Sequence, residues 1–331
     1  MNLSKIITPI LTVYLFFISC SSGGINQKTE YVMKEELLMD TLITVRIPES
    51  IQSEKIINLA FDEFRRIENK FSKSIEASVV YKINNRETDS VKIDKEEEFL
   101  LKESLKYYEL TDSYFDISVY TIGQFWDFNL TDDSKVFDSL KLSEENFQYL
   151  GSSNIEIADG VIFFKNKFLK IDLGGIAKGY AIDRAIEILT KNKITSGVIN
   201  AGGDVYAFGK KNENEEWNIA IQNPDKQDEY LKVLKLSNKS TATSGDYQRF
   251  VIFNGKSYCH IFNPKTGKNA DYLRSVTVES ASAMTADAIA TAVMASESEY
   301  RNLIAGIFLK IQNISVFVKS KDKIEMEEFK N

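Results

Sequence analysis

Hydrophobic positions recur along the chain at two spacings, one typical of helices and one typical of strands. One face of a predicted helix carries Ile56, Ala60, Phe64 and Phe71, and we expect this helix to begin near Ser53. Its apolar face predicts packing against a core, and nothing in it indicates chemistry.

A second helix is predicted from a start signal. Asp94 precedes it and Glu97 follows three residues later, which is the spacing of a capping box. We expect this helix to direct Phe99, Leu105 and Tyr108 inward. It is interpreted as a structural element like the first.

Strand patterns dominate the rest of the chain. A strand candidate at 161–171 runs through a glycine turn into a helix that carries Ile182, Ile186 and Leu189. A short helix is expected at 285–295. The other strand candidates, recognised by β-branched and aromatic residues, are 36–47, 195–208, 216–222, 231–237, 249–254, 274–280 and 313–319. Strands outnumber helices after residue 190, which favours a mixed α+β fold over a doubly wound one, arranged as one compact domain with two lobes.

Composition narrows the class of protein. The chain has 331 residues, of which 43% are hydrophobic and 27% are charged, and this balance is typical of a globular protein rather than a disordered one. The formal net charge is -7, with no basic stripe along the sequence. Because nucleic-acid binding needs an excess of positive charge on one surface, we expect no nucleic-acid partner.

The N-terminus has the pattern of a bacterial lipoprotein signal. Lys5 precedes an apolar run from residue 6 to residue 18, which is short for a bilayer span, and the run ends at Ser19 and Cys20. We expect residues 1–19 to be a signal peptide and the Cys20 sulfur to carry lipid. An ordinary secretory or transmembrane segment is the alternative.

This signal defines an expected organisation and location. Residues 20–34 would form a flexible tether, and residues 35–331 the folded domain, held to a membrane on the periplasmic side of the cell envelope. Cys20 and Cys259 are the two cysteines of the chain. If Cys20 is acylated, the domain has one thiol and no internal disulfide.

His260 is the single histidine of the chain. A lone histidine is usually incidental, but Asn263, Pro264 and Gly267 follow it closely and predict a rigid turn of the kind that presents catalytic groups. An imidazole with an ordinary pKa of about 6.5 suits a general base near neutral pH.

Asp287 and Thr291 are four residues apart in an alanine-rich helix, which places their oxygens on one face. Carboxylate and hydroxyl oxygens suit a hard cation such as Mg2+. A polar edge on a buried helix would explain the same two residues, so the pair by itself leaves both readings open.

Two glycine-rich segments, 171–184 and 200–209, each combine glycines with acidic residues at the end of a strand. Such turns let a backbone approach a ligand, and a helix N-terminus after them favours an anion. The spacing matches neither a P-loop nor a dinucleotide-binding fingerprint. A plain helix start is the alternative to a shared polar cleft.

In their order along the chain these features resemble the ApbE family of FAD-dependent flavin transferases, over about residues 36–320. The motifs are MDT at 39–41, FS at 71–72, the segment 78–84, YFDISVYTIGQFWDF at 114–128, DLGGIAKGYAIDR, NAGGDVYAFG, TSGDYQRF at 243–250, YCHIFNPKTG at 258–267 and ADAIAT. The resemblance implies a two-lobed α+β domain with FAD bound between the lobes.

The resemblance also implies roles for individual residues. Asp287, Thr291 and the main-chain carbonyl of Ala177 would bind Mg2+, and His260 would be the catalytic base. The positions implied to contact FAD are Met39, Ser74, Tyr114, Phe115, Asp116, Asp172, Gly174, Lys178, Tyr180 and Ile261.

The activity that the resemblance implies is a Mg2+-dependent FAD:protein FMN transferase. It would attach FMN by a phosphoester bond to a Thr or Ser of an acceptor flavoprotein, such as a subunit of a membrane redox complex, and release AMP. Ser74 stands where many relatives have a tyrosine, and the loss of that stacking surface favours an alternative, hydrolysis of FAD to FMN and AMP. A flavin-binding lipoprotein without catalysis is the other alternative.

Overall fold

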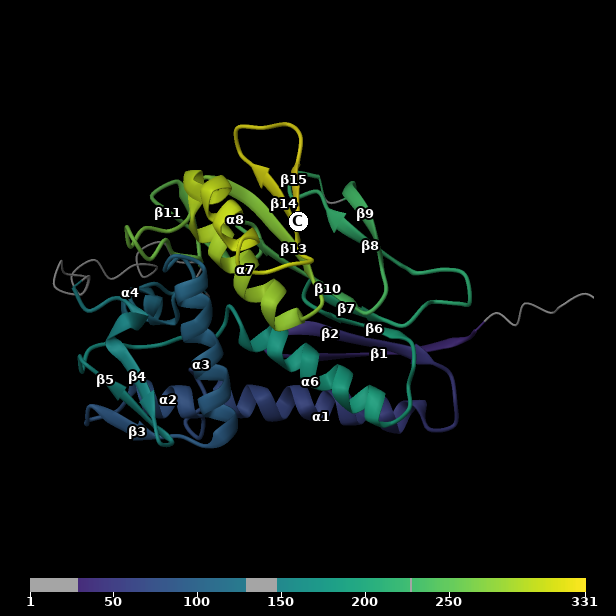
Figure 1. The fold of residues 1–331 in the computed structure, drawn as a ribbon, viewed down its shortest axis with the longest axis horizontal. Helices are drawn as coiled ribbons and strands as arrows, with labels where there is room; N and C mark the ends of the chain where they lie inside the picture. The colour runs from purple at the N-terminus through teal and green to yellow at the C-terminus, as the bar shows by residue number, and fades with distance from the viewer. Residues whose placement is uncertain (1–28, 129–147, 227) are drawn as a thin grey trace, which may run out of the picture.

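The computed structural model describes residues 29–128, 148–226 and 228–331 (Figure 1). Its helices are α1 (Ser53–Phe71), α2 (Val79–Asn84), α3 (Lys95–Leu110), α4 (Tyr120–Gly123), α6 (Ala177–Lys191), α7 (Ala283–Ala295) and α8 (Tyr300–Phe308). Its strands are β1 (Tyr31–Leu38), β2 (Thr41–Pro48), β3 (Ser90–Lys92), β4 (Ile155–Ala158), β5 (Val161–Phe164), β6 (Gly197–Ala201), β7 (Asp204–Phe208), β8 (Trp217–Gln222), β9 (Tyr230–Leu236), β10 (Lys239–Gly245), β11 (Phe250–Phe253), β12 (Lys256–Cys259), β13 (Leu273–Ser280), β14 (Ser315–Ser320) and β15 (Glu327–Lys330).

The largest sheet of the described residues has eight strands in the order β1-β2-β6-β7-β10-β13-β14-β15, and neighbouring strands are antiparallel. Two stretches expected to be single strands, 36–47 and 195–208, are hairpins. Met39 and Asp40 turn the first with positive φ angles of 53° and 58°, and Gly202 turns the second with φ 63°. Because non-glycine residues seldom adopt this conformation, the first turn gave no sequence signal.

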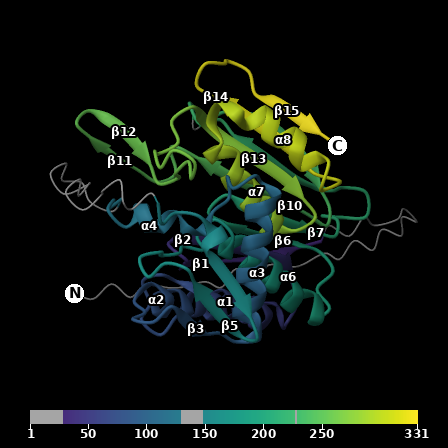
Figure 2. The same cartoon turned by 60° about the vertical axis from the view of Figure 1, so that its left-hand side comes forward.

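Helices α1, α6 and α7 cover one face of this sheet (Figures 1 and 2). The first begins at Ser53 as expected and buries Ile56, Ala60, Phe64 and Phe71. The β8–β9 hairpin covers part of the other face, where Trp217 and Leu234 pack with Phe317 of β14. The domain therefore has three layers at this end, with the main core between α1, α6, α7 and the sheet.

A smaller three-stranded sheet, β3-β5-β4, lies at the other end of α1 beside α2 and α3 (Figure 1). Asp94 caps α3 and forms the predicted capping box with Glu97. The predicted inward face of α3 was wrong at Phe99, whose exposure is 47%, whereas Leu100 and Tyr107 are buried. A shift of one residue rotates a helix face by about 100°, so the apolar pattern alone did not fix which side meets the core.

The mixed α+β architecture confirms the predicted fold class. Strand β1 begins at Tyr31, so the last four residues assigned to the tether pair in the sheet. The predicted signal peptide and lipidated Cys20 lie outside the described residues. Among the residues that are described, no helix is both long enough and apolar enough to cross a membrane.

Candidate active site

The glycine turn before α6 lies directly against the polar side of α7. A Cβ placed on Gly175 would lie 3.0 Å from Thr291 Oγ1 and 3.3 Å from Cε2 of Phe115. No hydrogen bond is made by Thr291 Oγ1 to any described residue, whereas the hydroxyls of Ser104 and Thr190, also within helices, donate to the carbonyl four residues back. A glycine is needed here because a side chain would fill the space next to the threonine hydroxyl.

Asp287 meets the first turn of α6. Its Oδ2 accepts a hydrogen bond of 3.0 Å from the Gly179 N–H, two residues after Ala177, and its exposure is 4%. Burial raises the pKa of the Asp287 carboxyl, and the nearby Lys178 ammonium and the Gly179 N–H partly offset this effect. Asp287 and Thr291 therefore meet the chain two residues after and two residues before Ala177, so the three predicted metal ligands lie at one α6–α7 contact.

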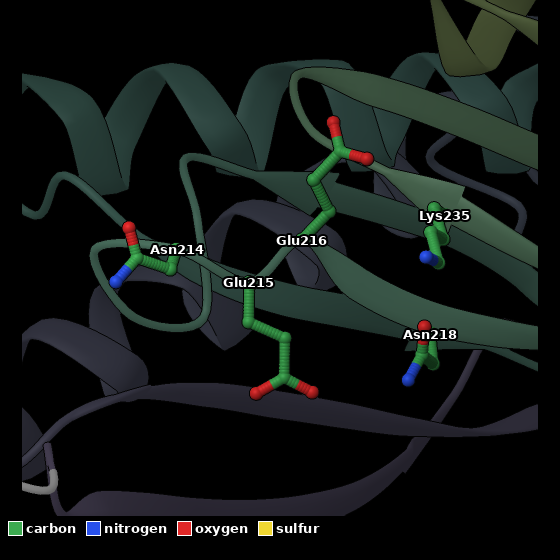
Figure 3. Close-up of a pocket in the computed structure, with 5 residues that line it drawn as sticks. All are labelled: Asn214, Glu215, Glu216, Asn218 and Lys235. Atoms are coloured by element: carbon green, nitrogen blue, oxygen red, sulfur yellow. The ribbon is translucent and has the colours of Figure 1, made fainter.

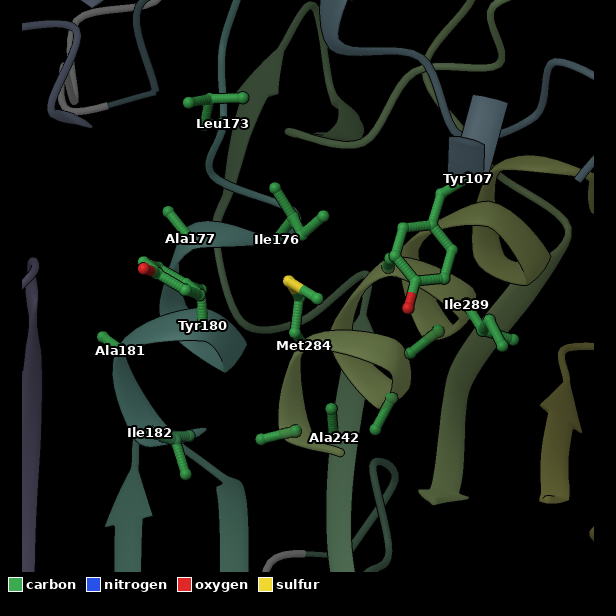
Figure 4. Close-up of a cluster of buried hydrophobic side chains, with 14 of the residues drawn as sticks. Tyr107, Leu173, Ile176, Ala177, Tyr180, Ala181, Ile182, Ala242, Met284 and Ile289 are labelled. Atoms are coloured by element: carbon green, nitrogen blue, oxygen red, sulfur yellow. The ribbon is translucent and has the colours of Figure 1, made fainter. Parts of the chain in front are cut away.

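The approach of α6 to α7 is unusually close at Gly179. A Cβ on this glycine would lie 2.7 Å from both the carbonyl carbon of Ala283 and the Cα of Met284, and closer still to the Ala283 oxygen. Figure 4 shows Ala177 and Tyr180 on α6 opposite Met284 on α7. Asp183 of α6 also caps α7: it accepts hydrogen bonds from the Ala283 N–H at 2.8 Å and the Met284 N–H at 3.1 Å. Only a residue without a side chain permits this geometry.

Lys178 lies between two carboxylates. Its ammonium forms an ion pair with Asp204, and the Asp287 carboxylate acts on it electrostatically. Burial lowers the pKa of Lys178, and the negative charge of Asp287 opposes this shift. Asp204 also accepts a 3.0 Å hydrogen bond from the Thr243 N–H, and its side chain is 2% exposed. The ammonium is therefore fixed in place by a buried acceptor.

His260 follows β12, and its ring is held by one backbone carbonyl. The oxygen of Arg249 accepts from the His260 N–H at 3.1 Å and lies 3.0 Å from Nδ1. Because a carbonyl oxygen only accepts, the neutral ring carries its proton on Nδ1 and presents the lone pair of Nε2. Burial lowers the pKa of His260 to about 4, while the Arg249 carbonyl and the Asp172 carboxylate oppose the shift. The ring is neutral at pH 7, as a general base must be.

Asp172 binds Lys73, a residue that sequence reasoning missed, and its charge acts on His260. Its Oδ1 accepts a 2.9 Å hydrogen bond from the Gly174 N–H, and its Oδ2 accepts from the Lys73 ammonium. The same ammonium lies 5.0 Å from the ring centroid of Tyr120. Burial opposes ionisation of Asp172, but Lys73, the Gly174 N–H and His260 outweigh it and hold the pKa of the carboxyl below its usual value.

Met39, Tyr114 and Ile261 are three further predicted FAD contacts. Met39 is at the β1–β2 turn, where its N–H donates to Glu68 at 2.9 Å, and Ile261 follows His260 with its side chain buried. The ring of Tyr114 lies 4.0 Å from the Lys265 ammonium. These positions stay predictions, since no ligand contact tests them.

Two of the predicted contact residues have partners inside the protein, and a third is exposed. Asp116 is buried and accepts from the Ser118 N–H at 2.8 Å and the Ser152 hydroxyl at 2.6 Å. Tyr180 is also buried, and its hydroxyl donates to Glu96 of α3 at 2.9 Å. Ser74 is exposed just after α1. The first two side chains stabilise the fold around the site, whatever else they do.

The oxygens available for a cation come from one carboxylate, one hydroxyl and one backbone carbonyl. In the described part of the chain, no three His, Cys, Asp or Glu side chains are grouped as a metal centre. The Oδ1 atom of Asp287 has no hydrogen bond to a described residue, because the Gly179 N–H donates to Oδ2. An oxygen-only set of this kind fits Mg2+, which keeps several water or phosphate ligands, better than zinc.

Two surface hollows lie elsewhere. One, of about 200 Å³, is lined by charged and amide side chains before and along β8 and β9 (Figure 3). The second, of about 160 Å³, lies beside Tyr31 and Arg46. None of the candidate residues lines either hollow, so the candidate site is identified from its chemical groups and not from the shape of the surface.

Some residues of the candidate site that were not predicted could have been found from the sequence, and others could not. Lys73 directly follows the FS motif, and Asp204 lies inside NAGGDVYAFG, so both were next to segments already singled out. The carbonyl of Arg249 carries no side-chain signal at all. Its role depends on the pairing of β11 with β12, which brings residues 249 and 260 together.

Comparison with known proteins gives the same family throughout. The model of the ApbE family matches residues 39–310. The FAD:protein FMN transferase of Haemophilus influenzae is 28% identical over 199 residues, which is 58% of each chain. That of Escherichia coli K12 is 24% identical over 321 residues, covering 89% of this chain and 87% of the relative. The matches to the Haemophilus influenzae and Vibrio cholerae enzymes span 58% and 60% of those proteins, less than two thirds of their length.

Solved structures agree with the fold. The crystal structure of the ApbE protein from Thermotoga maritima has a TM-score of 0.80 and 30% identity, covering 90% of this chain and 96% of the other. The flavin transferase ApbE from Vibrio cholerae has a TM-score of 0.77 and 21% identity, covering 91% and 97%. The second likeness bears on the fold alone, and together they confirm the expected architecture.

Proposed function

Because this chain belongs to the ApbE family, we propose that it is an FAD:protein FMN transferase, which moves FMN from FAD to a Ser or Thr hydroxyl of an acceptor protein and releases AMP. The observation that carries the proposal is the meeting of two groups of residues on the glycine turn between β5 and α6. Asp287 and Thr291 contact it from α7, while Asp172, at its start, is near enough to His260 for its charge to act on the imidazole.

His260 accepts the proton in the proposed reaction. The acceptor hydroxyl oxygen attacks the phosphorus that carries riboflavin, and its proton passes to the free Nε2. The bond from this phosphorus to the bridging oxygen breaks, and its electron pair leaves with AMP. The Arg249 carbonyl stabilises the imidazolium through Nδ1–H, and the Asp172 carboxylate stabilises it through its charge.

Mg2+ is the cation that we propose for the oxygens of Asp287, Thr291 and the Ala177 carbonyl. Bound there, it would neutralise negative charge on the diphosphate of FAD. Two contacts within the protein fix side chains at this site. The Gly179 N–H orients the Asp287 carboxylate, and Asp204 holds the ammonium of Lys178.

Hydrolysis of FAD is the second candidate, and Ser74 favours it. This residue is small and exposed at the end of α1, so it offers no aromatic surface for a flavin or adenine ring. With water in place of the acceptor hydroxyl, the same groups would yield FMN and AMP. Both reactions are consistent with one site.

One assay separates the candidates. The purified protein is incubated with FAD and Mg2+, with and without an acceptor domain, and AMP, FMN and protein-bound flavin are quantified by chromatography. AMP with flavinylated acceptor supports the transferase, and AMP with free FMN supports the hydrolase. Unchanged FAD under both conditions contradicts both and leaves a flavin-binding protein without catalysis.

We further propose that the mature protein is anchored to the cell envelope by lipid on Cys20, with the domain on the periplasmic side. The supporting observation is the apolar run that ends at Ser19 and Cys20. A Cys20→Ser variant should move from the membrane fraction to the soluble fraction and lose incorporation of labelled fatty acid. Unchanged membrane association in this variant would contradict the anchor.

A further inference from the structure

Lys73 is a cation at the glycine turn of the candidate site that the proposed reaction has not used. It follows α1 by two residues, and its ammonium donates to Oδ2 of Asp172. It is close enough to His260 that its charge lowers the pKa of the imidazole, while Asp172 raises it. Lys73 follows α1, Asp172 begins the glycine turn before α6 and His260 follows β12, and the charges of these three groups act on one another.

The ammonium of Lys73 has N–H groups that donate to no described residue. A lysine ammonium carries three N–H bonds, and the hydrogen bond to Asp172 is the one that Lys73 makes to a described residue. The ring of Tyr120, with its centroid 5.0 Å away, borders the ammonium on another side. The side chain is 30% exposed, so a ligand can reach the remaining donors.

Two other lysines near the site form ion pairs with other carboxylates. Lys178 is paired with Asp204, whose side chain is 2% exposed, compared with 27% for Asp172. Lys265 pairs with Asp112 at 2.6 Å and lies over the Tyr114 ring. Lys73 differs from them in that its partner Asp172 is partly exposed and its charge acts on His260, so a phosphate at His260 can reach its remaining donors.

We propose that Lys73 is a further catalytic residue, whose ammonium binds a non-bridging oxygen of the phosphoryl group under attack and stabilises its charge in the transition state. This inference rests on the proposed function. The acceptor oxygen forms its bond to that phosphorus, the bond to the AMP oxygen breaks, and the hydroxyl proton goes to His260. Lys73 keeps its proton throughout and supplies charge and hydrogen bonds.

Asp172 has a matching role as a positioning residue. The Gly174 N–H fixes its Oδ1 at 2.9 Å, which leaves Oδ2 to hold the Lys73 ammonium at the glycine turn. Without this carboxylate, a flexible lysine side chain at the end of a helix would have many conformations of similar energy.

The test compares Lys73→Met and Lys73→Arg with a matched lysine. Lys232 of β9 has the same kind of ion pair, with Glu328, at exposures of 33% and 29%, and it belongs to no part of the site. For Lys73→Met, kcat for AMP release should fall about 100-fold, as for the loss of one preorganised donor to a transition state. Affinity for FAD in EDTA, followed by flavin fluorescence, should weaken about threefold to tenfold. Lys73→Arg should keep most of kcat, and Lys232→Met should match the wild type.

Two results would overturn the role of Lys73 without touching the proposed function. One is a kcat for Lys73→Met close to that of the wild type, whatever happens to FAD affinity, because the contact would then act equally on substrate and transition state. The other is an equal loss in Lys73→Arg and Lys73→Met, because charge would then not be the cause. If wild type and Lys232→Met release no AMP, the proposed function itself fails.

Discussion

Replacing Gly179 by alanine tests whether the α6–α7 contact builds the site. In an ordinary helix this change is favourable by about 1 kcal/mol, because alanine loses less backbone freedom than glycine. Here the new Cβ would lie 2.7 Å from the carbonyl carbon of Ala283 and from the Cα of Met284. Carbon atoms normally approach to about 3.5–4.0 Å, so the two helices must separate by about 1 Å.

The repulsion should exceed the gain in helix propensity. Overpacking costs about 1–3 kcal/mol, and backbone atoms cannot rotate away as a side chain would. We expect a net loss of about 1–2 kcal/mol in the free energy of unfolding. A shift of about 1 Å at a catalytic group can lower the rate about 100-fold, and Asp287 is bonded to the Gly179 N–H itself.

Gly306 of α8 provides the control. A Cβ on Gly306 meets no atom within 4 Å, so Gly306→Ala should stabilise the protein by about 0.5–1 kcal/mol and leave activity unchanged. Urea unfolding followed by circular dichroism measures the stability, and chromatographic AMP release measures the activity. The reasoning is refuted if Gly179→Ala is as stable and as active as Gly306→Ala.

The remaining predictions concern charged and titratable groups. Burial lowers the pKa of His260 to about 4 in the folded protein, so the unfolded chain, with a pKa of about 6.5, binds the proton more strongly. The contribution of the neutral imidazole to the free energy of unfolding is therefore complete above pH 6.5 and is lost as pH falls toward 4. From pH 7.5 to pH 5 we expect the free energy of unfolding of the wild type to fall by about 2 kcal/mol more than that of His260→Gln, as measured by urea unfolding at both pH values. Asp287→Asn should abolish most of the stimulation of AMP release by Mg2+ without lowering the unfolding temperature, since the amide oxygen still accepts from Gly179 and burial disfavours the carboxylate; a Mg2+ response like that of wild type would contradict the ligand role. Asp183→Ala should cost about 2 kcal/mol in unfolding free energy, because the first N–H groups of α7 lose their buried acceptor, whereas Asp183→Asn should recover part of it.

Elements with local signals were predicted well. Helix α1 starts at Ser53, and α3 has its capping box at Asp94 and Glu97, because both signals act within one or two turns of chain. The hairpin at Met39 and Asp40 was read as one strand, since its turn uses two non-glycine residues with positive φ. Strands β3, β4, β10, β12 and β15 were not predicted, and their short or polar sequences form strands because neighbours in the sheets pair with them.

The sequence by itself determined the family, the mixed fold class and most of the chemical groups, since motif order and residue type are properties of the chain. Only the tertiary structure decided which groups work together. The Gly179 N–H meets Asp287 across 108 residues, and Lys73 meets Asp172 across 99. No local pattern specifies such contacts, because they depend on how closely α6 approaches α7 and on where the end of α1 lies against the glycine turn. These long-range contacts are set by packing of the whole core, and so the role of Lys73 emerged from the fold and not from its place after Phe71 and Ser72.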